Sequence, residues 1–183
     1  APLPDISGEP GVKCVTGDPK SPEVLNEFFS ADDAAGISGS DYPHAFELGD
    51  GRILWMFQDV FLGSDSSLWD DGFAHNTGLV QVGQCFKPIA KPAGKDWVRI
   101  PESKQLTTWL WPMDGELGVD GMFHLFFVEM HNPTGRGAYP PAAPQSTWHA
   151  TIDPVSLEVL SVVPAADASG ELFGWSIVTD AGY

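Results

Sequence analysis

Positive charge is scarce in this sequence. Its 183 residues include nine Lys and Arg but 25 Asp and Glu, which gives a formal net charge of −16 at pH 7. A surface this acidic repels phosphate groups, so we expect neither a nucleic acid partner nor an anionic membrane surface as a partner. A neutral polymer such as a polysaccharide is compatible with this charge.

Long apolar runs and the common catalytic motifs are also absent. No apolar stretch reaches the length of about 18 residues that a membrane-spanning helix requires. The sequence contains no G-x-S-x-G, G-x-G-x-x-G, P-loop or H-E-x-x-H pattern. Serine hydrolase, dinucleotide-binding, nucleotide-binding and zinc protease functions therefore lack their signatures.

Cysteine is limited to Cys14 and Cys85, and neither lies in a spacing typical of a zinc site. The sequence starts with APLPDISGEP, without an initiator Met or a signal peptide, and it resembles a mature N-terminus left after processing at a small residue. We therefore predict that the protein is secreted and that Cys14 and Cys85 form a disulfide. This bond would tie an N-terminal extension, residues 1–30, to the rest of the chain. Two buried free thiols are the alternative.

Glycine and proline are abundant, with 20 and 16 residues, and they separate short apolar runs. This distribution is typical of many short strands joined by turns, so an all-β fold is predicted. Only Glu23–Ser30 has a helical pattern. The candidate strands are Tyr42–Leu48, Arg52–Phe61, Asn76–Val82, Leu106–Pro112, Met122–Met130, Thr147–Ile152 and Gly174–Thr179.

Two stretches repeat at a fixed offset. DGRILWMFQDVFLG starts at Asp50 and DGMFHLFFVEMHNP starts at Asp120, so the offset is 120 − 50 = 70 residues. Each begins with Asp-Gly, which favours a hairpin because both turn positions can take positive φ. Each continues with a nearly uninterrupted apolar run, the composition of a strand that is buried on both faces.

Repeated sheets with buried inner strands predict a β-propeller, in which four-stranded blades surround a central channel. A β-sandwich is the alternative. We expect residues 1–183 to form a single all-β unit, the N-terminal portion of a propeller domain, because a third partial repeat at Thr179 stops at Tyr183. A missing C-terminal half or a second chain would complete the ring.

Asp59 and Glu129 occupy the same place in the two repeats, each after an apolar run. In a propeller both would lie near one mouth of the channel. Two carboxylates in an apolar setting can be held in different protonation states, as glycoside hydrolysis requires. Asp41 precedes the first strand of the opening hairpin, which would bring it across from Asp59. Solvated charges or turn caps are the alternative roles of these three acids.

Polar and aromatic residues near these acids are candidate sugar ligands. Trp69, in the acidic loop GSDSSLWDDG, is a candidate for stacking on a sugar ring. The same loop offers Asp65, Asp70 and Asp71 as structural calcium ligands, although without EF-hand spacing; no other metal and no cofactor is predicted. The other candidate ligands are His75, Asn76, His131 and Asn132.

Three motifs, DGRILWMFQDVFLGS, FAHNTGLVQ and GWSIVTDAGY, together resemble a secreted actinobacterial family of propeller domains. That family was formerly catalogued as a domain of unknown function, and members are assigned as endo-D-arabinanases acting on mycobacterial cell-wall arabinan. Its signature is an apolar strand that ends in G-D-T-F, and here Gln58-Asp59-Val60-Phe61 matches with Gly and Thr replaced.

The resemblance implies catalytic aspartates at Asp59 and Asp41 and a polysaccharide substrate. Five-bladed arabinan-degrading enzymes are also similar in placing three acids around a central pocket, so the chain would cover about half of such a ring. Glu129 as the third acid comes from the internal repeat. A non-catalytic carbohydrate-binding or structural propeller module is the alternative function.

Overall fold

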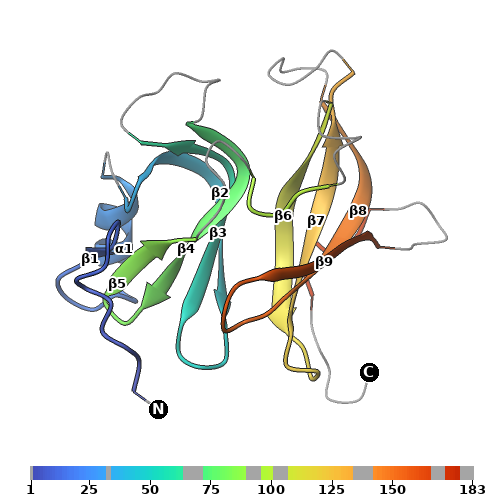
Figure 1. The fold of residues 1–183 in the computed structure, drawn as a ribbon. Coiled ribbons are helices and arrows are strands. Elements are labelled where there is room, and N and C mark those ends of the chain that lie inside the picture. Colours follow the sequence, from blue (N-terminus) through green and yellow to red (C-terminus); the bar gives the residue numbers. More distant parts are fainter. Residues whose placement is uncertain are drawn as a thin grey trace. The chain divides into compact units, whose positions relative to one another are not determined.

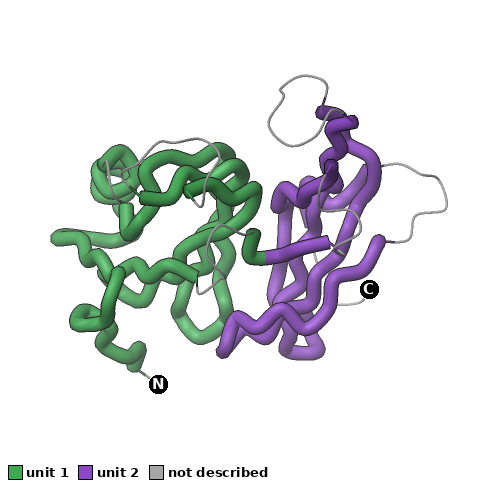
Figure 2. Tube along the Cα trace, turned by 45° about the horizontal axis from the view of Figure 1, so that its top comes forward, with its two compact units in different colours: residues 1–97 green, residues 98–183 purple. Residues whose placement is uncertain are grey.

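The chain divides into two compact units, residues 1–97 and 98–183 (Figure 2). Each unit contains one antiparallel sheet, so the predicted all-β class is confirmed (Figure 1). Among the described residues, neither sheet closes on itself and no strand pairs from one sheet to the other. The computed structural model describes residues 2–31, 34–63, 72–89, 96–100, 107–133, 142–165 and 172–177.

The sheet of the first unit is a four-stranded meander with one further short strand at its edge, in the order β1-β5-β4-β3-β2. β3 lies inside the sheet, and its alternating side chains are buried on both faces, with Leu54 and Met56 on one face and Phe57 on the other. This double burial explains the nearly continuous apolar run. The strands are β1 Lys13–Cys14, β2 Ile37–Glu47, β3 Ile53–Leu62, β4 Phe73–Val82 and β5 Cys85–Pro88.

One helix, α1 (Pro22–Phe29), packs on the sheet of the first unit. The Ser21 side chain accepts a hydrogen bond from the amide of Val24, and proline opens the helix, where its missing N–H costs nothing. The Phe28 ring stacks on Phe86 of β5 with a centroid distance of 4.1 Å. Within the described part of the chain, no helix is both long enough and apolar enough to cross a membrane.

The predicted disulfide is confirmed. Cys14 and Cys85 face each other in the β1–β5 pair, and their sulfur atoms are bonded. The extension that precedes the meander is therefore attached to it covalently, through β1, and by packing, through α1.

The second unit is also a four-stranded antiparallel meander, in the order β6-β7-β8-β9. β7 is buried on both faces, with Leu125 and Phe127 on one face and Val128 and Met130 on the other. The strands are β6 Thr108–Leu117, β7 Phe123–His131, β8 Ala143–Ile152 and β9 Val159–Pro164.

The internal repeat corresponds to equivalent strands. β3 and β7 begin at Ile53 and Phe123, and β4 and β8 begin at Phe73 and Ala143, so both pairs have the predicted offset (123 − 53 = 143 − 73 = 70). A single offset holds through two successive strands, which means that the two units share a strand–turn–strand–strand plan.

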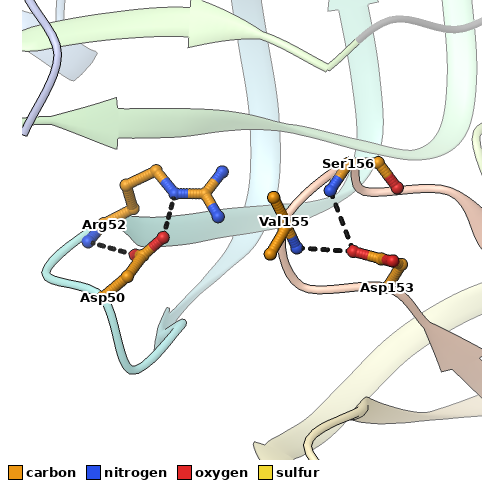
Figure 3. Close-up of polar contacts among 5 residues, drawn as sticks. All are labelled: Asp50, Arg52, Asp153, Val155 and Ser156. Atoms are coloured by element: carbon orange, nitrogen blue, oxygen red, sulfur yellow. Dashed lines mark hydrogen bonds and ion pairs between the residues drawn. The ribbon is translucent and has the colours of Figure 1, made fainter.

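The turns before β3 and β7 are alike, but their geometry differs from the prediction. Asp50 accepts a hydrogen bond from the amide of Arg52 at 3.0 Å (Figure 3), and Asp120 accepts one from the amide of Met122 at 3.0 Å. The predicted hairpins form, and positive φ occurs at the glycine that follows each aspartate and not at the aspartate. The aspartate caps the turn with its side chain instead. Asp153 caps the β8–β9 turn in a similar way (Figure 3).

The predicted strand Gly174–Thr179 does not form within its described part, residues 174–177. This segment bonds to β6 through Asp114, whose amide donates to the carbonyl of Gly174 and whose carboxylate accepts from the amide of Ile177. Six other predicted strands overlap β2, β3, β4, β6, β7 and β8. That the two units together form one domain, residues 1–183, stays a prediction.

Candidate functional site

The β2–β3 hairpin is irregular at the end opposite its tight turn. Asp41 pairs with Gln58 and His44 pairs with Met56, so two residues of β2, Tyr42 and the proline that follows it, oppose one residue of β3. Such a bulge redirects side chains and often lies beside an active site.

Two residues at this level carry backbone strain. Tyr42 has φ of 49° and Asp59 has φ of 44°, although neither is glycine. A non-glycine residue in the left-handed region inside a strand costs free energy, and such residues concentrate at functional sites. The backbone conformation of Asp59 therefore supports it as a candidate site residue, independently of its position in the sequence repeat.

The carboxylate of Asp59 contacts His75 of β4. Oδ1 of Asp59 lies 2.9 Å from Nδ1 of His75, and the two side chains are 26% and 10% exposed. The β3–β4 register brings them together, because the pairs Gln58–Asn76 and Val60–Ala74 lie on either side. At this distance the two side chains form a hydrogen bond, and its donor depends on which ring nitrogen of His75 carries hydrogen.

Asp96 holds the backbone of this histidine, a role that no sequence motif indicates. Oδ1 of Asp96 accepts a hydrogen bond from the amide of His75 at 2.7 Å, and Asp96 is buried. The next residue, Trp97, donates its amide to the carbonyl of Asn76 at 3.0 Å. The segment after β5 thus fastens the start of β4, a tertiary contact that no local pattern encodes.

Asp41, predicted to meet Asp59 across the hairpin, is exposed and pairs with Gln58, the residue before Asp59. The register therefore brings the two acidic residues to one end of one sheet.

Glu129 lies at the equivalent place in the second unit. Asp59 and Glu129 each follow the first residue of their strand by six positions (59 − 53 = 129 − 123 = 6). Glu129 is 5% exposed, and its Oε2 accepts hydrogen bonds from Ser146 Oγ at 2.5 Å and Trp148 Nε1 at 2.8 Å. This buried, hydrogen-bonded carboxylate joins β7 to β8. Its role as a catalytic acid stays a prediction.

The other candidate ligands differ in access. His131 ends β7 and is half-buried, whereas Asn76 and Asn132 are fully buried. Because a fully buried amide does not reach a ligand at the surface, direct sugar contact is disfavoured for both asparagines.

Trp69 and the calcium candidates Asp65, Asp70 and Asp71 lie outside the described residues. Within the described ranges, no group of three or more His, Cys, Asp or Glu side chains is arranged to hold a metal ion.

A second titratable cluster lies at the start of β7. His124 Nδ1 is 2.8 Å from His149 Nε2, and His124 Nε2 is 3.1 Å from Asp120 Oδ1. Burial, and then the nearby His124, lower the pKa of His149 below its ordinary value of 6.5. The amide of Met122, followed by His124, lowers the pKa of Asp120.

The lowered pKa of His149 predicts a pH-dependent stability of the second unit. The unfolded chain binds a proton at His149 near pH 6.5, whereas the folded chain binds it only at lower pH. The contribution is therefore complete above pH 6.5 and is lost as the pH falls through the lowered folded pKa. We expect the urea concentration at the unfolding midpoint to decrease as the pH falls below 6.5. This pH dependence should be weaker in His149→Gln. Equal pH dependence in both proteins would contradict this assignment.

Comparisons with known proteins give a family and a fold. The sequence model of a family described as a domain of unknown function, DUF5005, matches residues 23–183. A Bacteroides ovatus crystal structure, of a protein provisionally described as a hydrolase, superposes with a TM-score of 0.56 at 16% identity and covers 87% of this chain and 49% of that one. At this identity the likeness establishes the fold alone.

A ribonuclease HII of Halalkalibacterium halodurans is 29% identical over 90 residues, which is 49% of this chain and 34% of that protein. The chain thus spans about a third of the length of this curated relative and about half of the solved structure that it matches.

Proposed function

This chain belongs to the DUF5005 family, and we propose that it forms part of a secreted glycoside hydrolase that cleaves furanosides, with endo-acting cleavage of arabinan as its reaction. The observation that carries the proposal is the Asp59 carboxylate, which is strained at its backbone, partly buried and bonded to His75. A preorganised carboxylate of this kind suits a base or a nucleophile in glycoside hydrolysis.

The second carboxylate would be Asp41 or Glu129. Asp41 is favoured because it is exposed and lies in the same sheet as Asp59, beside Gln58. Glu129 has little access to solvent, and Oε2 already accepts two hydrogen bonds. In this assignment Asp41 donates the proton to the leaving group, and a catalytic role of Glu129, in the second unit, stays a prediction.

We place these acids in a β-propeller. Two consecutive four-stranded antiparallel meanders with equivalent strands 70 residues apart support blades (123 − 53 = 70). More polypeptide or a second chain would supply the other blades. The likeness to a protein that is provisionally described as a hydrolase agrees with hydrolysis as the reaction class. The proposal that the cleaved bond is glycosidic rests on the site at Asp59.

A nucleic acid substrate is disfavoured despite the partial likeness to a ribonuclease, because the net charge of −16 opposes binding to phosphates. The competing function is a carbohydrate-binding module without catalysis.

The direct test is an assay of the full-length protein on arabinan, with pyranoside polymers such as cellulose and xylan as controls. Endo-acting cleavage should lower the viscosity of arabinan before many reducing ends appear, and it should leave the controls intact. Retardation in arabinan-containing gels without any new reducing ends would favour the binding module. Cleavage of the pyranosides at equal rates would overturn the furanoside assignment.

A further inference from the structure

We propose that His75 is a positioning residue that donates its Nδ1–H to Asp59 and thereby assigns Asp59 the role of base or nucleophile, with Asp96 holding His75 in place. The inference rests on the proposed function, in which Asp59 is catalytic. It extends that function by removing His75 from the set of sugar ligands and by adding Asp96 to the site.

The contact has a direction. A carboxylate without a proton only accepts hydrogen bonds, so in the proposed state Nδ1 of His75 carries the hydrogen that lies between the two atoms, which are 2.9 Å apart. A protonated Asp59 would have to donate to Nδ1 instead. The Nδ1–H tautomer is therefore the state that identifies Asp59 as ionised.

Residues other than Asp59 hold His75 in place. Its side chain is 10% exposed, so the ring has little freedom to turn. Its amide donates to Asp96 Oδ1 at 2.7 Å, and its ring makes an edge-to-face contact with Phe73, with a centroid distance of 4.9 Å. These contacts set the position of His75 independently of Asp59.

The backbone of Asp59 is strained, and the contact with His75 holds the Asp59 side chain in position. With φ of 44°, the aspartate departs from the extended backbone of its strand, a conformation that costs free energy in a residue other than glycine. A bond from a fixed imidazole opposes relaxation of this side chain. In the reaction, Oδ1 would stay bonded to His75 while Asp59 acts on water or on the anomeric carbon, and the proton donor must then be a different acid.

The hydrogen bond can be tested without any activity. In protein labelled with ¹⁵N-histidine, long-range ¹H–¹⁵N spectra report which ring nitrogen carries hydrogen for each of the five histidines, and His75→Asn identifies the His75 signals. We expect hydrogen on Nδ1 of His75 in the wild type and a changed tautomer population in Asp59→Ala. An Nε2–H tautomer with bare Nδ1 in the wild type would overturn the proposal even if arabinan is cleaved.

Kinetics then separate positioning from sugar binding. His75→Leu removes the donor and should lower kcat about 100-fold, the cost typical of a misplaced reacting group, with little change in KM. His75→Asn keeps an amide N–H near the position of Nδ1 and should recover most of kcat. His149→Leu, in the other unit, is the matched control and should leave both constants unchanged. A raised KM with normal kcat in His75→Leu would overturn the proposal in favour of sugar binding.

Discussion

Asp59→Asn is expected to reduce kcat for arabinan cleavage by about 10²–10⁴-fold, the range typical of losing a positioned proton-transfer group. An amide has nearly the shape of the carboxylate but does not take a proton from water or attack the anomeric carbon. Because Asn tolerates positive φ about as well as Asp, the strained backbone should persist. Reducing-end assays with saturating arabinan measure the loss, and circular dichroism checks that the sheet is intact.

The controls for this variant use acids of the same hairpin. Asp50→Asn alters a carboxylate in the turn at the opposite end, where Asp50 bonds to Arg52, and should leave kcat unchanged. Asp41→Asn should reduce kcat if Asp41 is the proton donor, and an activated leaving group should recover part of that loss but none of the loss in Asp59→Asn. Wild-type kcat in Asp59→Asn would remove Asp59 from the chemistry. Retained binding of arabinan by Asp59→Asn agrees with either function and is a check on folding.

The sequence was sufficient for the strands that are buried on both faces. β3 and β7 are nearly continuous apolar runs, and the spacing between them in the sequence is enough to predict that Asp59 and Glu129 occupy equivalent positions. The disulfide prediction followed from a start that resembles a processed N-terminus and from two cysteines without a zinc-site spacing. These features depend on composition and spacing, which a single sequence displays directly.

The short edge strands could not be predicted in the same way. β1 has two residues, and β9 is half-buried or exposed along its whole length without a regular alternation, so neither carries a clear strand pattern in the sequence. Gly174–Thr179 has the apolar pattern of a strand, but the amide of Ile177 bonds to the carboxylate of Asp114. Pairing partners decide such segments, and pairing is a tertiary property.

The site shows the same division between local and tertiary information. The identity of Asp59 as a candidate acid came from its position in the chain, but its positive φ and its contact with His75 came from a bulge and from the β3–β4 register. His75 was predicted as a sugar ligand because it follows a strand-and-loop transition and could donate a hydrogen bond to a sugar hydroxyl. Asp96 had no signal, since only the fold brings it to the His75 amide.

The Cys14→Ala, Cys85→Ala double variant is expected to lower the free energy of unfolding of the first unit by about 4 kcal/mol. The bond closes a loop across a sequence separation of 71, and restricting a loop of this length in the unfolded chain gives a stabilisation of about that size. The effect should be local at first, because β1 pairs only with β5 in the described part of the sheet. Urea unfolding, monitored by fluorescence and circular dichroism, measures the change.

Hydrogen exchange should show where the loss falls. Without the bond, β1 keeps its two register pairs with β5, and α1 follows β1 closely in the chain. Faster exchange is therefore expected in β1, β5 and α1, while the amides of β7 in the other unit should keep their protection. Wild-type protein treated with a reductant is the matched control, because it lacks the disulfide but carries no substitution. A double variant within about 1 kcal/mol of the wild type would mean that strain in the folded state, or residual structure in the unfolded chain, cancels the loop restriction. Noncovalent contacts, among them the packing of Phe28 on Phe86 and the bond from the Gln84 side chain to the carbonyl of Gly17, would then be sufficient to attach the N-terminal segment.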